Sequence, residues 1–204
     1  MTIRIAAITP RVKVADVAFN TNEIENAMAR AEGQGVEILC CPEMSLTGYT
    51  CQDLFGQQLL LEQAETAMLK LIELSRNLNL TTIVGLPFRF GGLLLNCAAV
   101  IQKGKVHGIV PKTYLPNYNE FYEMRWFSSS TAVPKHSTTR FCGQNVPVAA
   151  DLLFEVGDVK FGIEFVDGKF NISAVVTHHT SDWSVITLDK PIPHIWLKAV
   201  RRLD

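Results

Sequence analysis

The chain has 204 residues, of which 48% are hydrophobic and 19% are charged, which is enough for one hydrophobic core of ordinary size. Its 19 lysines and arginines nearly balance 20 acidic residues, and the net charge of −1 gives no broad electrostatic attraction to nucleic acids or anionic membranes. We therefore expect neither nucleic acid nor a membrane as a partner.

The apolar residues form no run of about 18, and residues 1–5 alternate like a strand instead of forming a secretory apolar block. We expect a cytoplasmic protein. The cysteines are odd in number and lack C-x-x-C spacing, which argues against a disulfide framework and a structural zinc site. We predict no metal and no cofactor. The cysteines are Cys40, Cys41, Cys51, Cys97 and Cys142.

The first third of the chain predicts a strand, a helix and a second strand. Residues 3–7 alternate apolar and polar side chains, as a strand does. Asn22 can cap a helix with Glu25 three residues later, and Gly33 ends it. Residues 36–41 form a nearly continuous apolar run, which is typical of a strand buried on both faces.

The remaining elements follow the same logic. Helical spacing runs from Leu60 to about Leu78. Glycine turns separate three strand-like segments, at 81–90, 93–102 and 106–112. Residues 128–148 resemble a long connection, and the segments 151–156 and 159–165 predict a hairpin. The alternation predicts an α/β domain with helices covering sheet faces.

Two charged residues stand where predicted strands end. Glu43 follows the apolar run at 36–41, and Lys112 ends the segment at 106–112. Pockets commonly form where chains leave a sheet, and a carboxylate beside an ammonium suits acyl transfer. The alternative for Glu43 is an ordinary solvated loop carboxylate. The aromatic residues between 114 and 122 either pack locally or contact a ligand.

At these residues the sequence resembles the carbon-nitrogen hydrolase (nitrilase) superfamily, and within it the glutaminase domain of glutamine-dependent NAD synthetases. The resemblance covers about residues 3–165 and implies a four-layer αββα sandwich, which we expect to be incomplete at its C-terminal side. The matching segments are Pro42-Glu43, Leu46-Thr47-Gly48-Tyr49, Gln52-Asp53-Leu54, Ile83 to Pro87, Asn96, Val110 to Pro116, Glu120 to Glu123, Arg125, Asp151 to Phe154 and Gly162-Ile163-Glu164.

The resemblance also implies roles for single residues. Glu43 is expected to be the general base, Lys112 to stabilise the oxyanion, and Glu120 to be a supporting carboxylate. Three aromatic residues match positions that line the glutamine pocket in this branch: Tyr49, Tyr118 and Phe121. The substrate implied is a small amide, glutamine, which is hydrolysed to glutamate and ammonia.

The sequence departs from the family at the nucleophile. The family continues its Gly-hydrophobic-Glu strand into a cysteine, whereas this chain has Val166 at that position. Valine has no nucleophilic atom, so we expect this chain to be inactive by itself. Two other cysteines stand near the motif: Cys41 shares the strand face of Glu43, and Cys51 lies in the loop with Tyr49. We interpret both as structural thiols.

We divide the chain into a partial hydrolase domain at residues 1–165 and a divergent tail at 166–204, with strand-like segments at 172–177 and 183–188. The ATP-binding synthetase domain of the family has no counterpart here. The resemblance implies at least a homodimer. The competing hypothesis is a non-catalytic binding or assembly module on the same scaffold, and residue 166 separates the two hypotheses.

Overall fold

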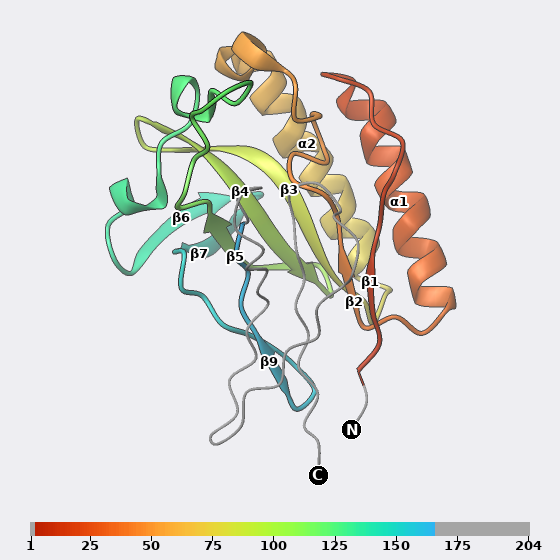
Figure 1. The fold of residues 1–204 in the computed structure, drawn as a ribbon. Helices are drawn as coiled ribbons and strands as arrows, with labels where there is room; N and C mark the ends of the chain where they lie inside the picture. Colours follow the sequence, from red (N-terminus) through yellow and green to blue (C-terminus); the bar gives the residue numbers. More distant parts are fainter. Residues whose placement is uncertain (1–2, 166–204) are drawn as a thin grey trace.

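The computed structural model describes residues 3–165, in which two helices lie over a seven-stranded sheet (Figure 1). This arrangement confirms the α/β fold class. The sheet contains β1 (Ile5–Ala7), β2 (Ile38–Cys40), β3 (Thr81–Phe90), β4 (Leu93–Gln102), β5 (Lys105–Pro111), β6 (Ser137–Phe141) and β7 (Gln144–Val148). A separate hairpin contains β8 (Phe154–Val156) and β9 (Val159–Phe161). The helices are α1 (Val17–Gly33) and α2 (Gln58–Ser75), with 3-10 helices η1 (Gln52–Gly56), η2 (Glu123–Arg125) and η3 (Ser130–Ala132).

The strand directions bring the ends of β2 and β5 to one edge of the sheet. The strand order is β1-β2-β3-β4-β5-β7-β6. Strand β2 is parallel to β3, β3 is antiparallel to β4, and β4 is antiparallel to β5. Strand β5 therefore runs in the same direction as β2. The residues that follow the two strands, among them Glu43 and Lys112, emerge at the same edge.

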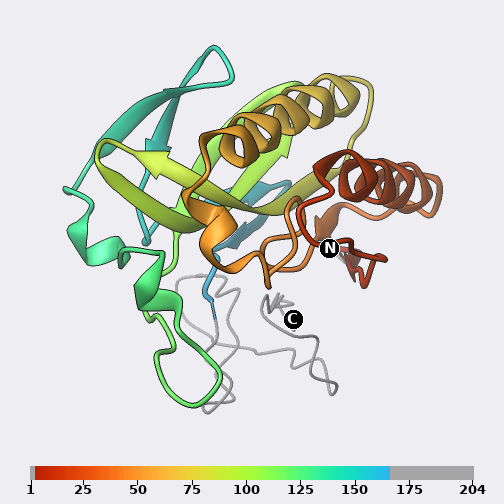
Figure 2. The ribbon, with the colours of Figure 1, turned by 90° about the horizontal axis from the view of Figure 1, so that it is seen from above.

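The sheet separates two apolar layers. Helices α1 and α2 cover one face, and the β8–β9 hairpin lies on the other (Figure 2). Alternation along β2 divides its side chains accordingly: Leu39 and Cys41 pack in the helix-side core, whereas Ile38 and Cys40 pack in the core that contains Phe154. This explains the continuous apolar run that predicted a strand buried on both faces.

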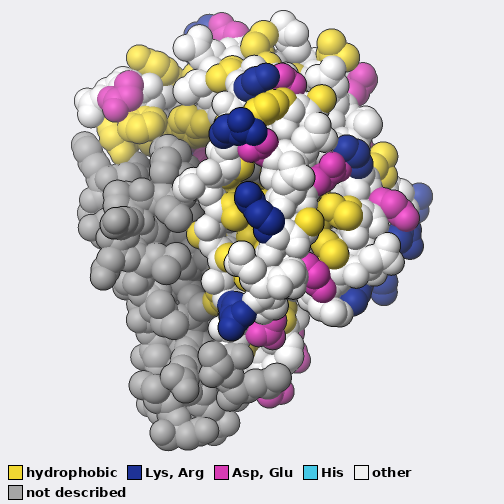
Figure 3. All heavy atoms as spheres, turned by 90° about the vertical axis from the view of Figure 1, so that its right-hand side faces the viewer, with side chains coloured by type: hydrophobic (Ala, Val, Ile, Leu, Met, Phe, Trp, Pro, Cys, Tyr) yellow, Lys and Arg dark blue, Asp and Glu magenta, His cyan; other side chains and the backbone are white. Residues whose placement is uncertain are grey.

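The face of the molecule beside α1 and α2 carries charges of both signs. On the side of the molecule shown in Figure 3, lysine and arginine side chains lie among acidic and hydrophobic ones. The pair of Lys70 and Glu25, 2.9 Å apart, joins α2 to α1. Within residues 3–165, no helix is long and apolar enough to cross a membrane.

Helix α1 begins earlier than the sequence pattern predicts. Its N-cap is Asp16, whose Oδ1 accepts a hydrogen bond of 3.0 Å from the Phe19 N–H, and Asn22 lies inside the helix. Asn20 and Thr21, the fourth and fifth residues of the helix, are buried polar residues on its inward face. Their polarity concealed this part of the helix, because a hydrophobic periodicity counts only apolar side chains.

The segment 128–148 is not a plain connection, because it contains β6 and β7. These strands form a hairpin at the edge of the sheet, and Ile109 of β5 pairs with Val148 of β7. Cys142 and Gly143 make its turn with φ of 49° and 75°. The pattern was missed because an edge strand keeps one side in water and is rich in polar residues. The strand-like segments of the tail lie outside the described residues.

Candidate active site

A tight turn after β2 places Glu43 at the edge of the sheet. Met44 has a φ of 52°, and its carbonyl accepts hydrogen bonds from the N–H groups of Thr47 and Gly48, at 3.1 and 2.7 Å. Ser45 Oγ lies 3.2 Å from both the nitrogen and the carbonyl oxygen of Gly85 in β3. The turn is therefore fixed both within itself and against the neighbouring strand.

Gly85 allows this turn to lie directly on β3. A Cβ atom at this position would lie 2.5 Å from the Pro42 carbonyl oxygen, 2.6 Å from the Met44 nitrogen and 2.9 Å from the Glu43 Cα. All three are backbone atoms, which cannot rotate away as a side chain can. A glycine is therefore required because of the close approach of two backbones.

Lys112 lies at the centre of a buried ion cluster. Its Nζ atom is 3.0 Å from Glu43 Oε1 and 2.8 Å from Glu123 Oε1. The three side chains are at most 1% exposed. The Lys112 N–H donates to the Asn96 carbonyl at 2.8 Å, and Asn96 Nδ2 donates to Glu43 Oε1. Strand β4 thereby holds both the lysine backbone and the carboxylate of Glu43.

Glu123 reaches the cluster from η2. The hydroxyl of Tyr49 donates to Glu123 Oε1, the same oxygen that Lys112 contacts. On the surface, Arg125 Nε and Nη2 bind the two carboxylate oxygens of Asp53 at 2.8 and 3.1 Å, which joins η2 to η1. The hydrogen bonds from Arg125 and then Trp126 lower the pKa of Asp53 to about 2.

The cluster has two carboxyl groups for one ammonium group. Burial raises the pKa of Glu43 above its ordinary value, and Lys112 and Asn96 oppose that rise. Burial and then the charge of Glu43 raise the pKa of Glu123. Burial alone lowers the pKa of Lys112, but the two carboxylates outweigh it and raise that pKa. A carboxylate with a raised pKa beside an ammonium is suited to accept and return a proton.

The structure brings together only part of the residue set predicted from sequence. Glu43 and Lys112, each predicted at a strand end, meet because β2 and β5 run in the same direction. Glu120 is exposed, and the carboxylate beside Lys112 belongs to Glu123. Glu123 reaches Lys112 because it is the buried first residue of η2, and the supporting role of Glu120 stays a prediction. Glu123 belongs to the matched segment 120–123, but its inward position depends on η2, which the sequence pattern did not predict.

The three predicted pocket aromatics lie in two places. Tyr118 and Phe121 contact each other edge to face, with ring centroids 5.8 Å apart. Tyr49 contacts the Glu123 carboxylate and thereby belongs to the ion cluster. Asn96 is the other cluster residue whose role the sequence did not reveal. A buried asparagine in the middle of an apolar strand was the available signal.

The two alternative cysteines are placed as structural thiols. Cys41 is buried in the helix-side core, and burial raises its pKa well above the ordinary value. Cys51 Sγ donates to the Thr47 carbonyl at 3.1 Å, and burial raises its pKa as well. A thiol with a raised pKa stays protonated and is a poor nucleophile. Val166 lies outside the described residues.

A cavity of about 400 Å³ lies beside the end of β5. Its lining includes Pro111, Thr113 and the segments 150–153 and 162–165, but not Glu43, Lys112 or Glu123. Leu152, Ile163 and Phe165 of this lining pack in the core on the hairpin side of the sheet, so the cavity lies on that side. Within residues 3–165, no three His, Cys, Asp or Glu side chains gather closely enough to hold a metal ion.

The variant Tyr49→Phe is expected to lower the free energy of unfolding by about 1.5 to 3 kcal/mol, the usual loss for a buried hydrogen bond to a charged group. Urea denaturation at pH 7 measures this loss. Tyr114→Phe is the matched control, because Tyr114 is 70% exposed and should change stability by no more than about 0.5 kcal/mol. Equal losses in both variants would contradict the contact with Glu123.

Comparison with known proteins identifies relatives of the chain. The sequence profile of the carbon-nitrogen hydrolases matches residues 4–197, a range that continues beyond the matching segments named above. The glutamine-dependent NAD(+) synthetase of Mycobacterium tuberculosis (strain ATCC 25618 / H37Rv) is 35% identical over 157 residues, which cover 77% of this chain and 23% of that protein. The corresponding protein of Aquifex aeolicus is 38% identical over 114 residues, which cover 56% and 20%. The chain thus spans about a quarter or less of these relatives.

Solved structures agree with the sequence relatives. A glutamine-dependent NAD(+) synthetase from Cytophaga hutchinsonii superposes with a TM-score of 0.68 at 34% identity, over 79% of this chain and 27% of that one. An amidase from Nesterenkonia sp. superposes with a TM-score of 0.55 at 21% identity, over 72% and 54%. The second likeness shows a shared fold only. Together these structures confirm the nitrilase-type fold.

Proposed function

The chain belongs to the carbon-nitrogen hydrolase family, and we propose that its cluster of Glu43, Lys112 and Glu123 is the acid–base part of a centre that hydrolyses the side-chain amide of glutamine. Homology supports amide hydrolysis as the reaction class. The observation that carries the proposal is the ammonium of Lys112 held 3.0 Å from Glu43 and 2.8 Å from Glu123 out of contact with water. Glutamine as the substrate is supported by the relatives named above.

The cluster supplies two groups that thiol-dependent amide hydrolysis requires. The Glu43 carboxylate takes the proton of a thiol, whose sulfur bonds to the amide carbon, and the Lys112 ammonium stabilises the negative oxygen that forms. When the carbon–nitrogen bond breaks, protonated Glu43 gives its proton to the departing nitrogen, which leaves as ammonia. Glu43 then takes a proton from water as the water attacks the thioester, and it returns that proton to the thiolate.

Glu123 and Asn96 prepare these groups. Glu123 accepts a second hydrogen bond from the Lys112 ammonium, and Asn96 donates to the Glu43 carboxylate. Preorganised charge in a buried site requires little rearrangement during the reaction, so it stabilises the transition state more than the same charge in water. The roles of the aromatic residues Tyr118 and Phe121 in holding glutamine are part of the proposal.

The thiol itself is the component in which this chain departs from its family. The resemblance assigns Val166 to the nucleophile position, and we propose that the chain does not hydrolyse glutamine by itself. The second candidate, a binding or assembly module, is favoured by one specific observation: the ion cluster is fully formed although a valine stands at that position. Both candidates share the site and differ in whether a bond is broken.

Three further expectations belong to the proposal. The ammonia would serve a synthetase domain of the kind named in the relatives, since the chain spans only part of them. Five free cysteines among the described residues suit a reducing compartment, which supports a cytoplasmic location. The family resemblance supports a homodimer. The division of the chain at residue 165 is also part of the proposal, and the family profile continues past it to residue 197.

Release of ammonia from glutamine tests the function in four proteins: the unmodified chain, Val166→Cys, and Glu43→Gln in each background. We expect no release from the unmodified chain and release from Val166→Cys that Glu43→Gln reduces by a factor of about 10² to 10⁴. Release by the unmodified chain that depends on Glu43 would overturn inactivity. If no variant releases ammonia while glutamine binds to the unmodified chain in calorimetry, the binding module is the correct function.

A further inference from the structure

The turn that carries Glu43 is braced from outside the active site by the loop that precedes α1. The N–H of Ala15 donates to the Thr47 carbonyl at 2.7 Å. Gly48 lies so close to this loop that an added Cβ would be 3.2 Å from the Val14 Cα and 3.4 Å from Val12 Cγ1. The N-terminal loop and the turn therefore contact each other along their backbones.

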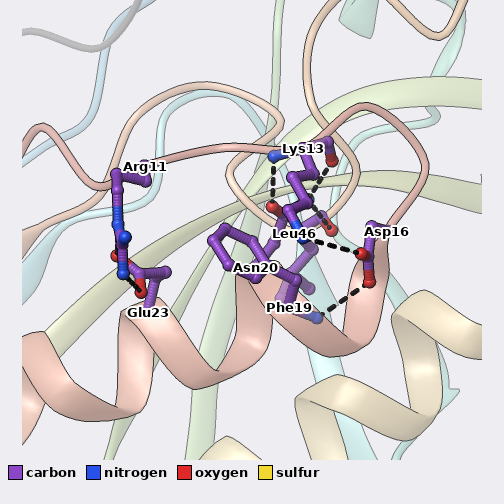
Figure 4. A network of polar contacts seen from close by, with 7 residues as sticks. All are labelled: Arg11, Lys13, Asp16, Phe19, Asn20, Glu23 and Leu46. Atoms are coloured by element: carbon purple, nitrogen blue, oxygen red, sulfur yellow. Dashed lines mark hydrogen bonds and ion pairs between the residues drawn. The ribbon is translucent and has the colours of Figure 1, made fainter.

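One side chain of α1 connects the two segments. Asn20 Nδ2 donates to the Leu46 carbonyl at 3.0 Å and to the Lys13 carbonyl at 2.8 Å, and Asn20 Oδ1 accepts from the Lys13 N–H at 2.8 Å (Figure 4). Asn20 is 1% exposed, so these bonds are made away from water. The single amide uses both of its N–H groups and its oxygen on backbone groups of two different loops.

The rest of the loop is fixed to the same helix. Arg11 forms an ion pair with Glu23 at 2.8 Å, and Lys13 Nζ lies 4.2 Å from the centre of the Phe19 ring (Figure 4). Asp16 caps the helix through the Phe19 N–H. Asn20 thus joins the helix, the loop and the turn that carries Glu43. Its side-chain hydrogen bonds go to the backbone of Lys13 and Leu46 and not to the residues of the ion cluster.

We propose that Asn20 is a positioning residue for Glu43: it holds the Leu46 carbonyl and thereby fixes the turn that presents the carboxylate to Lys112. The functional meaning of this role rests on the function proposed above. Leu46 is three residues from Glu43, and the bonds from Thr47 and Gly48 to the Met44 carbonyl make the turn one rigid unit. A displacement at Leu46 is therefore transmitted to Glu43.

The test compares Asn20→Asp and Asn20→Ala with Thr21→Val. Asn20→Asp keeps the shape of the side chain but directs an oxygen at the two carbonyls to which Asn20 now donates. Thr21 is the matched control, because it is buried on the same turn of α1 and its hydroxyl bonds only to the helix carbonyl of Val17 at 2.6 Å. The measurements are amide hydrogen exchange at residues 44–48 and the ¹⁵N resonance of the Lys112 ammonium.

We expect exchange at 44–48 to become about tenfold faster in both Asn20 variants than in Thr21→Val, and the Lys112 resonance to broaden or shift only in the Asn20 variants. Slow exchange in β3 and β4 shows that the fold is kept. If both Asn20 variants leave the Lys112 resonance unchanged, or if Thr21→Val alters it equally, Asn20 is merely structural and the inference is wrong. These measurements require no catalytic activity, so their outcome does not depend on the result of the ammonia assay.

Discussion

Replacing Lys112 by methionine is expected to lower the free energy of unfolding at pH 7 by about 3 to 5 kcal/mol, the range found when one partner of a buried ion pair is removed. Methionine keeps the length of the apolar stem but lacks the charge. Glu43 and Glu123 then remain buried without the ammonium that both contact. The loss thus comes from two buried carboxylates that have lost their shared ammonium and not from a cavity.

The loss should depend on pH in a defined direction. Burial already raises the pKa of Glu43 and Glu123, and the attraction of Lys112 limits that rise. Without Lys112, both folded-state pKa values rise further above the unfolded value of about 4.3. Groups with a raised folded-state pKa stabilise the fold below the unfolded pKa, and this stabilisation is lost as pH rises through the folded-state pKa. The deficit of Lys112→Met should therefore be largest at neutral pH and shrink towards pH 4.

Lys70→Met is the control for this experiment. Lys70 contacts Glu25 at 2.9 Å, but its side chain is 59% exposed. Exposed ion pairs contribute about 0 to 1 kcal/mol, so this variant should change stability little at any pH. Urea denaturation of both variants between pH 4 and 8 makes the comparison. A loss in Lys112→Met that is small, or independent of pH, would mean that the two carboxylates are not buried beside the lysine.

The variant Gly85→Ala is expected to lower the free energy of unfolding by about 3 kcal/mol, at the upper end of the usual range for overpacking. The added methyl group would lie 2.5 to 2.9 Å from three backbone atoms of the Glu43 turn. Because no side-chain rotation relieves this contact, β3 and the turn must separate. We expect faster amide exchange at residues 43–48, measured together with the urea midpoint.

Gly33→Ala is the matched control for Gly85→Ala. Gly33 is the last residue of α1, and no atom lies within 4 Å of its added Cβ. Alanine is a better helix former than glycine, so this variant should be as stable as the parent or slightly more stable. Similar losses from both substitutions would show that the backbone of β3 and the turn do not approach as closely as described.

Much of the fold could be predicted because its central elements have simple periodicities. The two longest strands, β3 and β4, have the bounds predicted from sequence, and helix α2 begins within two residues of the predicted start. The predicted bounds were wrong where buried or paired residues are polar, so that no apolar pattern marks the element. Helix α1 buries Asn20 and Thr21 near its start, and the β6–β7 hairpin is a polar edge. Neither feature has a hydrophobic period that a sequence can show.

The site was predictable to the level of its strand ends. Glu43 and Lys112 were predicted at the ends of strands, whereas their convergence depends on the directions of β2 and β5, which no local pattern specified. The inward position of Glu123 also required the path of the chain through η2. The proposed role of Asn20 could not be predicted either, because it depends on contacts with two loops, at Lys13 and Leu46, that are 33 residues apart in sequence.

The proposed hydrolysis and the role of Asn20 both require that Glu43 and Lys112 form one coupled buried site. A double-mutant cycle tests this claim most directly, with unfolding free energies of the parent, Glu43→Gln, Lys112→Met and the double variant at pH 7. Once Lys112 is absent, Glu43→Gln removes a buried charge that has lost its ammonium partner, so the two changes should not add. We predict a coupling free energy of at least about 2 kcal/mol, whereas additivity within about 0.5 kcal/mol would contradict the site.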